Sequence, residues 1–329
     1  MSAQFQIQSP GILSLLQDAG RYGQHTIGLT NGGPMDPIAY KWANRLLGNS
    51  DNATVIETTV GGLSLISHVN TQVAVTGANV SVKINGAPQP QWQTLAIAKN
   101  DVLELGFATQ GCRIYLAVKD GFQVDTQFSS TSTVMREGVG GLTGKALTKG
   151  DVIHVLDRDA SERVGLLKLP EKQQPEYLNA ITLRVIPGYQ EHAFSRHDQR
   201  MFFYHEYTVS DLCDRMGYRL SGEKVNCNIE GILSEGIALG AIQIPKDGQP
   251  IILMNDRQTI GGYPKIGSVL SLDLAKLAQL TQGGKVRFEP ITMDHAHNLL
   301  LLAQHKFENT VLEIIKPEQH INTKSGQSK

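Results

Sequence analysis

The sequence predicts a mainly β protein with few helices, built as two β-barrel domains. Three observations lead to this prediction. The length of 329 residues suits two domains of about 150 residues each. The chain has 33 glycines, which indicates many tight turns. Polar or glycine turns lead directly into short apolar strands, at residues 99–103, 149–153, 246–254 and 283–286. Closely spaced turns that feed short strands favour barrels over alternating βαβ units.

The first half opens with a glycine-punctuated loop over residues 17–34, and the clearest helix of the chain follows it. Asp36 is suited to the N-cap, Pro37 to the first helical position, and Gly48 to the C-terminal stop. One predicted buried face repeats every four residues, at Ile38, Trp42 and Leu46. The sequence therefore predicts a helix from Asp36 to Gly48.

Strands are predicted after this helix, because the apolar pattern changes to short runs and a period of two. Residues 73–75, 80–84 and 103–105 are predicted strands, and Asn85-Gly86 indicates a hairpin turn. Residues 114–118 are apolar throughout, which predicts a strand buried on both faces. These signals place a first domain at residues 1–160.

The second half is predicted to be a domain at residues 180–310. Residues 157–179 are charged and contain prolines, which indicates a connection between the halves. Helices are predicted at 271–282 and 294–306, and residues 311–329 form a polar C-terminal tail.

Composition excludes several classes of partner. The formal charge is −1, and no block of basic residues is typical of nucleic-acid or membrane binding. No signal peptide is predicted, and no apolar run reaches about 18 residues. The three cysteines are widely spaced, which suits reduced thiols and a cytoplasmic location.

Local catalytic motifs are absent. Residues 138–146 are similar to a phosphate-binding loop, but Val139 and Ala146 stand where that motif needs glycine and Ser/Thr. The histidine pairs His192/His197 and His295/His297 lack a third zinc ligand, so no metal site is predicted. There is no G-x-S-x-G elbow. Local motifs therefore do not identify a nucleophile.

Three polar and glycine-rich segments carry a resemblance to a known family. They are residues 16–36, 214–222 and 255–265, and Glu57-Thr58, Ser129-Ser130 and residues 240–243 also match. In this order, over residues 5 to 295, they resemble the allophanate-hydrolase-subunit-2 or carboxyltransferase A/B family. One position departs from the family pattern, because Arg257 replaces a glycine in Asp-Gly-Gln-Thr. The local turn is therefore expected to differ there.

The resemblance implies a fold and three functions. The fold is a pair of cyclophilin-like β-barrel domains with a cleft between them. The first function is that of the 5-oxoprolinase C subunit, which works with the A and B subunits to hydrolyse 5-oxoproline to L-glutamate. ATP, with Mg²⁺, would be shared with or bound by a partner subunit. The alternatives are carboxyl transfer from a biotinylated partner to urea or a related amide, and regulation as the antagonist of a kinase inhibitor. The chain lacks the Ala-Met-Lys-Met sequence of covalent biotin attachment.

Three catalytic residues are predicted near the end of one strand. Asp256 could orient a substrate N–H or a water, and Lys265 could stabilise developing negative charge. Gln243 could donate to and accept from an amide or lactam. Alternatively, Asp256 only caps a turn and Gln243 lies on a solvated strand face.

Further residues are predicted to bind substrate. Those in the same segment are Gln258, Thr259, Gly261, Gly262 and Tyr263. Arg215 offers a planar fork for a carboxylate. Alternatively, Arg215 pairs with Asp211 or Asp214, and the same pairing is predicted for Arg219. Asp18 and Arg21 could pair to hold the Gly20 turn. Glu57 is either a buried partner of Arg21 or a site carboxylate.

Overall fold

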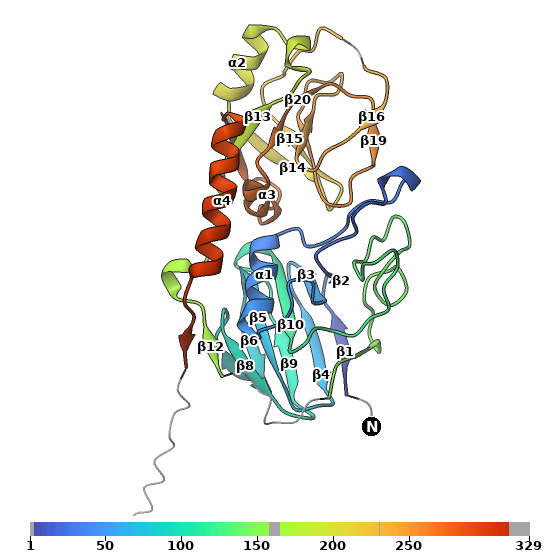
Figure 1. Cartoon of the computed structure of the whole chain (residues 1–329), viewed down its shortest axis with the longest axis vertical. Helices are drawn as coiled ribbons and strands as arrows, with labels where there is room; N and C mark the ends of the chain where they lie inside the picture. The colour runs from blue at the N-terminus through green and yellow to red at the C-terminus, as the bar shows by residue number, and fades with distance from the viewer. Residues whose placement is uncertain (1–2, 158–164, 230, 316–329) are drawn as a thin grey trace, which may run out of the picture.

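The computed structural model describes residues 3–157, 165–229 and 231–315. Within these ranges the protein is mainly β with four α-helices, arranged as two bodies that follow each other along the chain (Figure 1). The prediction of a mainly β fold with few helices is confirmed. The cyclophilin-like character of the two halves stays a prediction.

The first half consists of two sheets. The six-stranded sheet has the order β11-β1-β4-β9-β6-β7, and the five-stranded sheet has the order β2-β3-β10-β5-β8. Their strands are β1 Gln4–Pro10, β2 Leu13–Gln17, β3 Val55–Thr59, β4 Leu63–Ser67, β5 Thr71–Asn79, β6 Val82–Ile84, β7 Ala87–Gln89, β8 Thr94–Ile97, β9 Val102–Leu105, β10 Gln110–Val118 and β11 Val152–His154. A core of residues such as Phe5, Leu65 and Ile114 lies between them.

The first half is not the closed barrel that was predicted, because its strands form two separate sheets. The chain crosses from one sheet to the other at Gly11, between β1 and β2. A Cβ at Gly11 would lie 2.3 Å from the carbonyl oxygen of Gly61, so the backbones approach too closely for a side chain. The Asn85-Gly86 hairpin joins β6 to β7 with positive φ at both residues, as predicted.

The second half contains a closed barrel of seven strands, in the order β13-β20-β17-β18-β15-β14-β21. Its strands are β13 Ala180–Pro187, β14 Tyr207–Cys213, β15 Gly217–Ser221, β17 Ala241–Gln243, β18 Ile251–Leu253, β20 Lys265–Val269 and β21 Lys285–Pro290. The pair β13–β21 is parallel and closes the barrel, and the other pairs are antiparallel. Here the barrel prediction is confirmed.

Helix α1 spans Pro37–Leu46, as the capping signals predict. Asp36 accepts hydrogen bonds from the backbone N–H groups of Ile38 and Ala39. Trp42 and Leu46 are buried and Ile38 is half-buried, so the predicted apolar face lies against the first half.

The other three helices belong to the second half. They are α2 Arg196–Tyr204, α3 Ser271–Ala278 and α4 Met293–Asn309. Helix α3 is shorter than the predicted 271–282, because Gln279 ends it and turns its amide into the interior. Short 3₁₀ turns are η1 His25–Ile27, η3 Glu171–Gln173 and η4 Glu191–Ala193.

Helix α4 leads the chain back to the first half (Figure 1). Phe307 lies against Trp42, with ring centroids 4.5 Å apart. Strand β22 (Glu313–Ile314) then pairs with β12 (Leu167–Lys168), so residues 313–314 of the predicted tail are a strand. The rest of the tail, from residue 316, lies outside the described residues. No helix in the described ranges is long and apolar enough to cross a membrane.

Candidate functional site

A buried guanidinium links the two halves. Arg215, in the turn between β14 and β15, donates from Nε and Nη2 to the two carboxylate oxygens of Asp256, at 2.8 and 3.0 Å. It also donates from Nη1 to Glu57 of β3, at 2.5 Å, and from Nη2 to the Gly33 carbonyl, at 2.7 Å. All three charged residues are at most 5% exposed. Arg215 is therefore the partner of two carboxylates from opposite halves.

The carboxylates of this cluster have further partners. Glu57 accepts from the Tyr115 hydroxyl at 2.7 Å and from the Met35 N–H at 2.8 Å. Burial raises the pKa of Asp256, and the guanidinium of Arg215 opposes that rise. Glu57 is thus a buried partner, as one alternative predicts, but its partner is Arg215 and not Arg21.

A second set of contacts joins the halves at the N-terminus of α1. Gln279 donates from Nε2 to Asp36 at 2.8 Å and to the Arg113 carbonyl at 3.0 Å. Its Oε1 accepts from the N–H groups of Cys112 and Arg113, at 2.8 and 2.9 Å. Tyr177 also donates to Asp36, at 3.1 Å. The helix cap of the first half is therefore also an attachment point for the second half.

The segment after β18 contacts the N-terminal loop. Asn255 donates to the carbonyls of Gly32 and Pro34, both at 3.1 Å. Arg257 is buried and donates to the Ile237 carbonyl at 3.1 Å and to Asn31 at 3.3 Å. The arginine that departs from the family pattern thus lies inside the protein and bridges three segments.

A second polar cluster lies inside the second half, around Lys265. Lys265 begins β20, is 9% exposed and forms an ion pair with Glu235. Gln190 accepts from the Lys265 backbone N–H at 2.9 Å and donates from Nε2 to Glu235 at 2.9 Å and to the Tyr189 hydroxyl at 3.1 Å. The hydrogen bond from Lys265 is the main cause that lowers the pKa of Glu235, and Tyr189 contributes.

Gln243 lies beside this cluster and has an unused donor. It pairs with Lys265 across strands β17 and β20 and is 1% exposed, and its Nε2 has no hydrogen-bond partner. A Cβ at Gly261 would lie 2.8 Å from that Nε2 and 2.4 Å from Cδ1 of Ile237, so the backbone of β19 approaches the Gln243 amide closely. Gln243 is therefore in the interior, and the alternative of a solvated strand face is wrong.

The other substrate-binding residues predicted in the segment 258–263 lie in or next to a two-stranded ribbon. This ribbon consists of β16 Glu235–Gly236 and β19 Ile260–Gly261. The carbonyl of Thr259 accepts from Ile237, at 3.0 Å, and that of Gly262 accepts from Ile232, at 2.9 Å. Gln258 is half-buried, and Tyr263 is 44% exposed. The structure thus brings Gly261 to Gln243, and the other residues of this segment hold or flank the ribbon.

Asp18 and Arg21 lie in the first half and do not pair with each other. Asp18 accepts from the hydroxyls of Ser130 and Ser132, at 2.6 and 2.7 Å, and from the Gly20 N–H at 3.0 Å. Arg21 donates to the carbonyls of Gln127 and Ser132, at 3.1 and 3.0 Å. Asp18 does hold the Gly20 turn, but through the backbone N–H and not through Arg21.

Arg219 also differs from its predicted pairing. It forms an exposed ion pair with Asp247, at 2.9 Å, instead of with Asp211 or Asp214. Arg215 pairs with neither of those aspartates, because its side chain turns inward between the halves.

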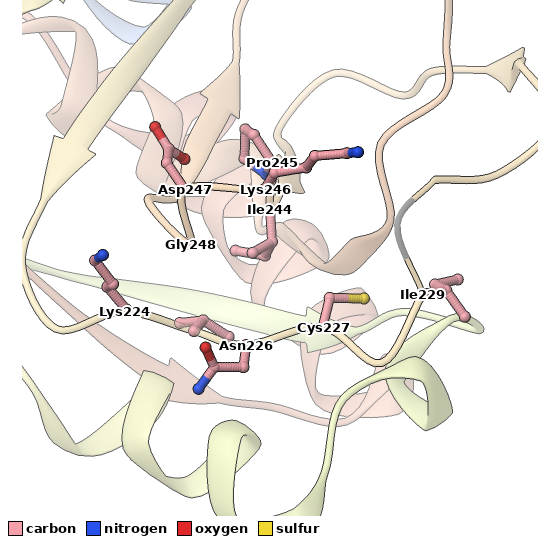
Figure 2. Close-up of a pocket in the computed structure, with 10 residues that line it drawn as sticks. Lys224, Asn226, Cys227, Ile229, Ile244, Pro245, Lys246, Asp247 and Gly248 are labelled. Atoms are coloured by element: carbon pink, nitrogen blue, oxygen red, sulfur yellow. The ribbon is translucent and has the colours of Figure 1, made fainter.

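A hollow of about 400 Å³ lies elsewhere on the second half, between residues 224–229 and 244–248 (Figure 2). Lys224, Asn226 and Cys227 line one side, and Pro245 and Lys246 lie across from them. None of the predicted catalytic or substrate-binding residues lines it. Gln243 directly precedes the lining residue Ile244, so the hollow and the Lys265 cluster use neighbouring positions of the chain.

Sequence reasoning missed three residues of the Lys265 cluster, namely Tyr189, Gln190 and Glu235. They come from segments 30 to 76 residues away from Lys265 along the chain, and no local motif joins them. The signal that could have found Glu235 is that Lys265, predicted as a site residue, needs a carboxylate partner. Among the residues that the structure describes, no group of three His, Cys, Asp or Glu side chains could hold a metal ion.

Comparisons with known proteins match this chain over most of its length. The family model of the carboxyltransferase domain, subdomain A and B, matches residues 27–290. The chain is 34% identical to the 5-oxoprolinase C subunit of Escherichia coli, over 91% of this chain and 94% of that protein. It is 33% identical to the 5-oxoprolinase C subunit of Haemophilus influenzae, over 86% of this chain and 90% of that protein.

Larger proteins contain a similar segment. The urea amidolyase of K. lactis has a TM-score of 0.88 and 27% identity, over 96% of this chain and 20% of that one. A putative urea carboxylase of Emericella nidulans is 30% identical, over 95% of this chain and 26% of that protein. In these proteins the likeness covers one part of a longer polypeptide.

Proposed function

Because the chain belongs to the carboxyltransferase family of subdomains A and B, we propose that it is the C subunit of an ATP-dependent 5-oxoprolinase. In this proposal it works in the cytoplasm with the A and B subunits to hydrolyse the lactam of 5-oxoproline to L-glutamate. The near full-length likeness to the 5-oxoprolinase C subunits of two organisms supports it. The names of those relatives also imply further subunits.

One structural observation indicates where in this chain the substrate would bind. The unpartnered Nε2 of Gln243 lies beside the buried ammonium of Lys265, in the wall of the second-half barrel. A buried amide donor without a partner is costly for folding alone, and a carbonyl or carboxylate oxygen of a ligand would satisfy it. A lactam that carries a carboxylate has both kinds of oxygen.

The chemistry requires activation of the lactam, because a resonance-stabilised amide reacts slowly with water. The lactam oxygen would be phosphorylated by ATP, with release of ADP. Water would then add to the activated carbon, the ring C–N bond would break, and phosphate would leave, which gives the carboxylate and the amine of glutamate. In this chain Gln243 would hold the reacting carbonyl in place, and the positive charge of Lys265 beside it would favour the negative charge that develops on that carbonyl. The nucleotide and its Mg²⁺ would be shared with or bound by a partner subunit, so this chain alone should be inactive.

Asp256 can act as a catalytic group only if its hydrogen bonds to Arg215 change. Both of its carboxylate oxygens accept from Arg215, so Asp256 would have to release one of these bonds to act on a water. Arg215 would likewise have to leave Glu57 or Asp256 to bind a substrate carboxylate. The geometry therefore supports Gln243 and Lys265 more strongly than Asp256 and Arg215.

Reconstitution tests the function. Purified A, B and C subunits are mixed with ATP and 5-oxoproline, and glutamate is assayed with and without this chain. We expect glutamate only when the chain is present, and Lys265→Met to lower kcat on the order of 100-fold. Lys285→Met is the matched control, because Lys285 is exposed and its Nζ donates only to Thr208. Full glutamate production without the chain would contradict the proposal.

Carboxyl transfer to urea or a related amide, from a separate biotinylated partner, is the second candidate. It is supported by the likeness of nearly the whole chain to segments of proteins named urea carboxylase and urea amidolyase. Recovery of a biotinylated protein with the purified chain, together with no glutamate in the reconstitution, would favour this candidate.

A further inference from the structure

Three donors converge on one carboxylate in the Lys265 cluster. Glu235 is bound by the ammonium of Lys265, by Nε2 of Gln190 at 2.9 Å and by the hydroxyl of Tyr189. A fourth donor, Nε2 of Gln243, lies beside them and has no partner. A group of donors with one inserted anion is the arrangement of an anion-binding site.

The inserted carboxylate comes from a weakly held element. Glu235 belongs to β16, a strand of two residues that pairs with β19 outside the barrel, and backbone hydrogen bonds of Ile232 and Ile237 flank this pair. Its side chain is 32% exposed, whereas that of Lys265 is 11% exposed. A short two-stranded ribbon is marginally stable by itself, so Glu235 can leave at a small cost while Lys265 stays in place.

We infer that the Lys265 cluster binds the carboxylate of a small ligand and that Glu235 occupies its place in the unliganded chain. When the ligand binds, its carboxylate takes over the bonds from Lys265, Gln190 and Tyr189. A second acceptor of the same ligand, such as a lactam carbonyl, then receives the free hydrogen bond of Gln243. The ligand class is therefore a small carboxylate with a neighbouring amide or carbonyl oxygen. The choice of 5-oxoproline as that ligand rests on the proposed function, but the carboxylate site itself does not.

The test compares three ligands on the full-length chain. We would titrate 5-oxoproline, 2-pyrrolidinone, which has the same ring without the carboxylate, and propionate, a carboxylate without the ring, into the wild-type chain and Glu235→Gln by calorimetry. The substitution removes the competing negative charge, so more of the chain is ready to bind. We expect 5-oxoproline to bind on the order of tenfold more tightly to the variant, and 2-pyrrolidinone to bind equally to both. Glu206→Gln is the matched control, because Glu206 forms an ion pair with Arg287 on the surface of the same half and should change neither affinity.

The outcomes separate the site from the function. If both chains bind 5-oxoproline and Glu235→Gln binds it no more tightly than wild type, or if neither chain binds 5-oxoproline or propionate, the inference is overturned. If propionate binds the variant more tightly and 5-oxoproline binds neither chain, the carboxylate site stands and the proposed substrate fails. Lys265→Met should abolish the gain in either case. Thermal unfolding of each variant shows whether it is folded, and Glu235→Ser serves as the second variant if Glu235→Gln is not.

Discussion

The two polar clusters of this protein differ in how completely their groups are paired. Around Arg215, a guanidinium from the second half is bound to two carboxylates, one from each half, and each carboxylate has its oxygens occupied. Around Lys265, one amide donor has no partner and the carboxylate comes from a short ribbon. The first cluster has the character of a structural joint, and the second has that of a binding site. A buried charged residue is therefore not evidence of catalysis until its partners are counted.

Removal of Arg215 should have the largest effect on stability. Arg215→Met leaves Glu57 and Asp256 buried without their partner, and breaking a buried ion pair in this way costs about 3–5 kcal/mol. Chemical denaturation followed by fluorescence would measure the change. Arg219→Met is the matched control, because Arg219 pairs with Asp247 at the surface and such a pair contributes about 0–1 kcal/mol. Equal effects of the two substitutions would contradict the structural role of Arg215.

Gln279 tests the second joint between the halves. Gln279→Ala removes the acceptor of two backbone N–H groups and the donor to Asp36, and we expect a loss of about 2–3 kcal/mol. Gln304→Ala, on the exposed face of α4, should change the free energy of unfolding by less than about 0.5 kcal/mol. If the two variants unfold at the same denaturant concentration, Gln279 does not hold the halves together.

Asp273 shows how an ion pair behaves when it lies within one half. Burial opposes ionisation of Asp273, but hydrogen bonds from Arg184 and Lys276 lower its pKa below the ordinary 3.8. Its contribution to stability is therefore present above the unfolded-chain pKa, about 3.9, and is lost as the pH falls through the folded pKa. We expect Asp273→Asn to cost about 1.5–2 kcal/mol at pH 7. The difference from wild type should shrink as unfolding is measured at lower pH, and a difference independent of pH down to about 2 would contradict this role.

Substitution of Gln243 should have the smallest effect on stability, in contrast to substitution of Arg215. Gln243→Met keeps the size of the side chain and removes a donor that has no partner, so stability should change by less than about 1 kcal/mol. Binding of 5-oxoproline should nevertheless weaken, because the predicted bond to the ligand is lost. A large loss of stability would show that the amide has a partner in the folded protein, and unchanged binding would remove Gln243 from the site.

Local signals in the sequence were sufficient for part of the fold. Asp36 and Pro37 predicted the start of α1, and the apolar run at residues 114–118 predicted the buried C-terminal part of β10. Both signals act over a few residues and are independent of distant partners. The closed barrel in one half and the two sheets in the other could not be told apart, because that difference depends on which distant strands pair.

The candidate site was predictable only in its types of residue. Asp256, Arg215 and Glu57 were each identified as chemically important, but Arg215 pairs with partners 41 and 158 positions away along the chain, which leaves no local pattern. Glu235 and Gln190 were missed for the same reason. The unused donor of Gln243 is a property of three-dimensional packing, which no property of one residue can predict.

The position of a bound ligand tests the central contrast most directly. A crystal structure of the chain with 5-oxoproline, or with propionate, would locate the carboxylate of the ligand. We predict that it lies within hydrogen-bond distance of Nζ of Lys265, with Glu235 displaced and every bond of Arg215 to Asp256 and Glu57 unchanged. A ligand carboxylate bound to Arg215, with Glu235 still paired to Lys265, would contradict this assignment of the two clusters.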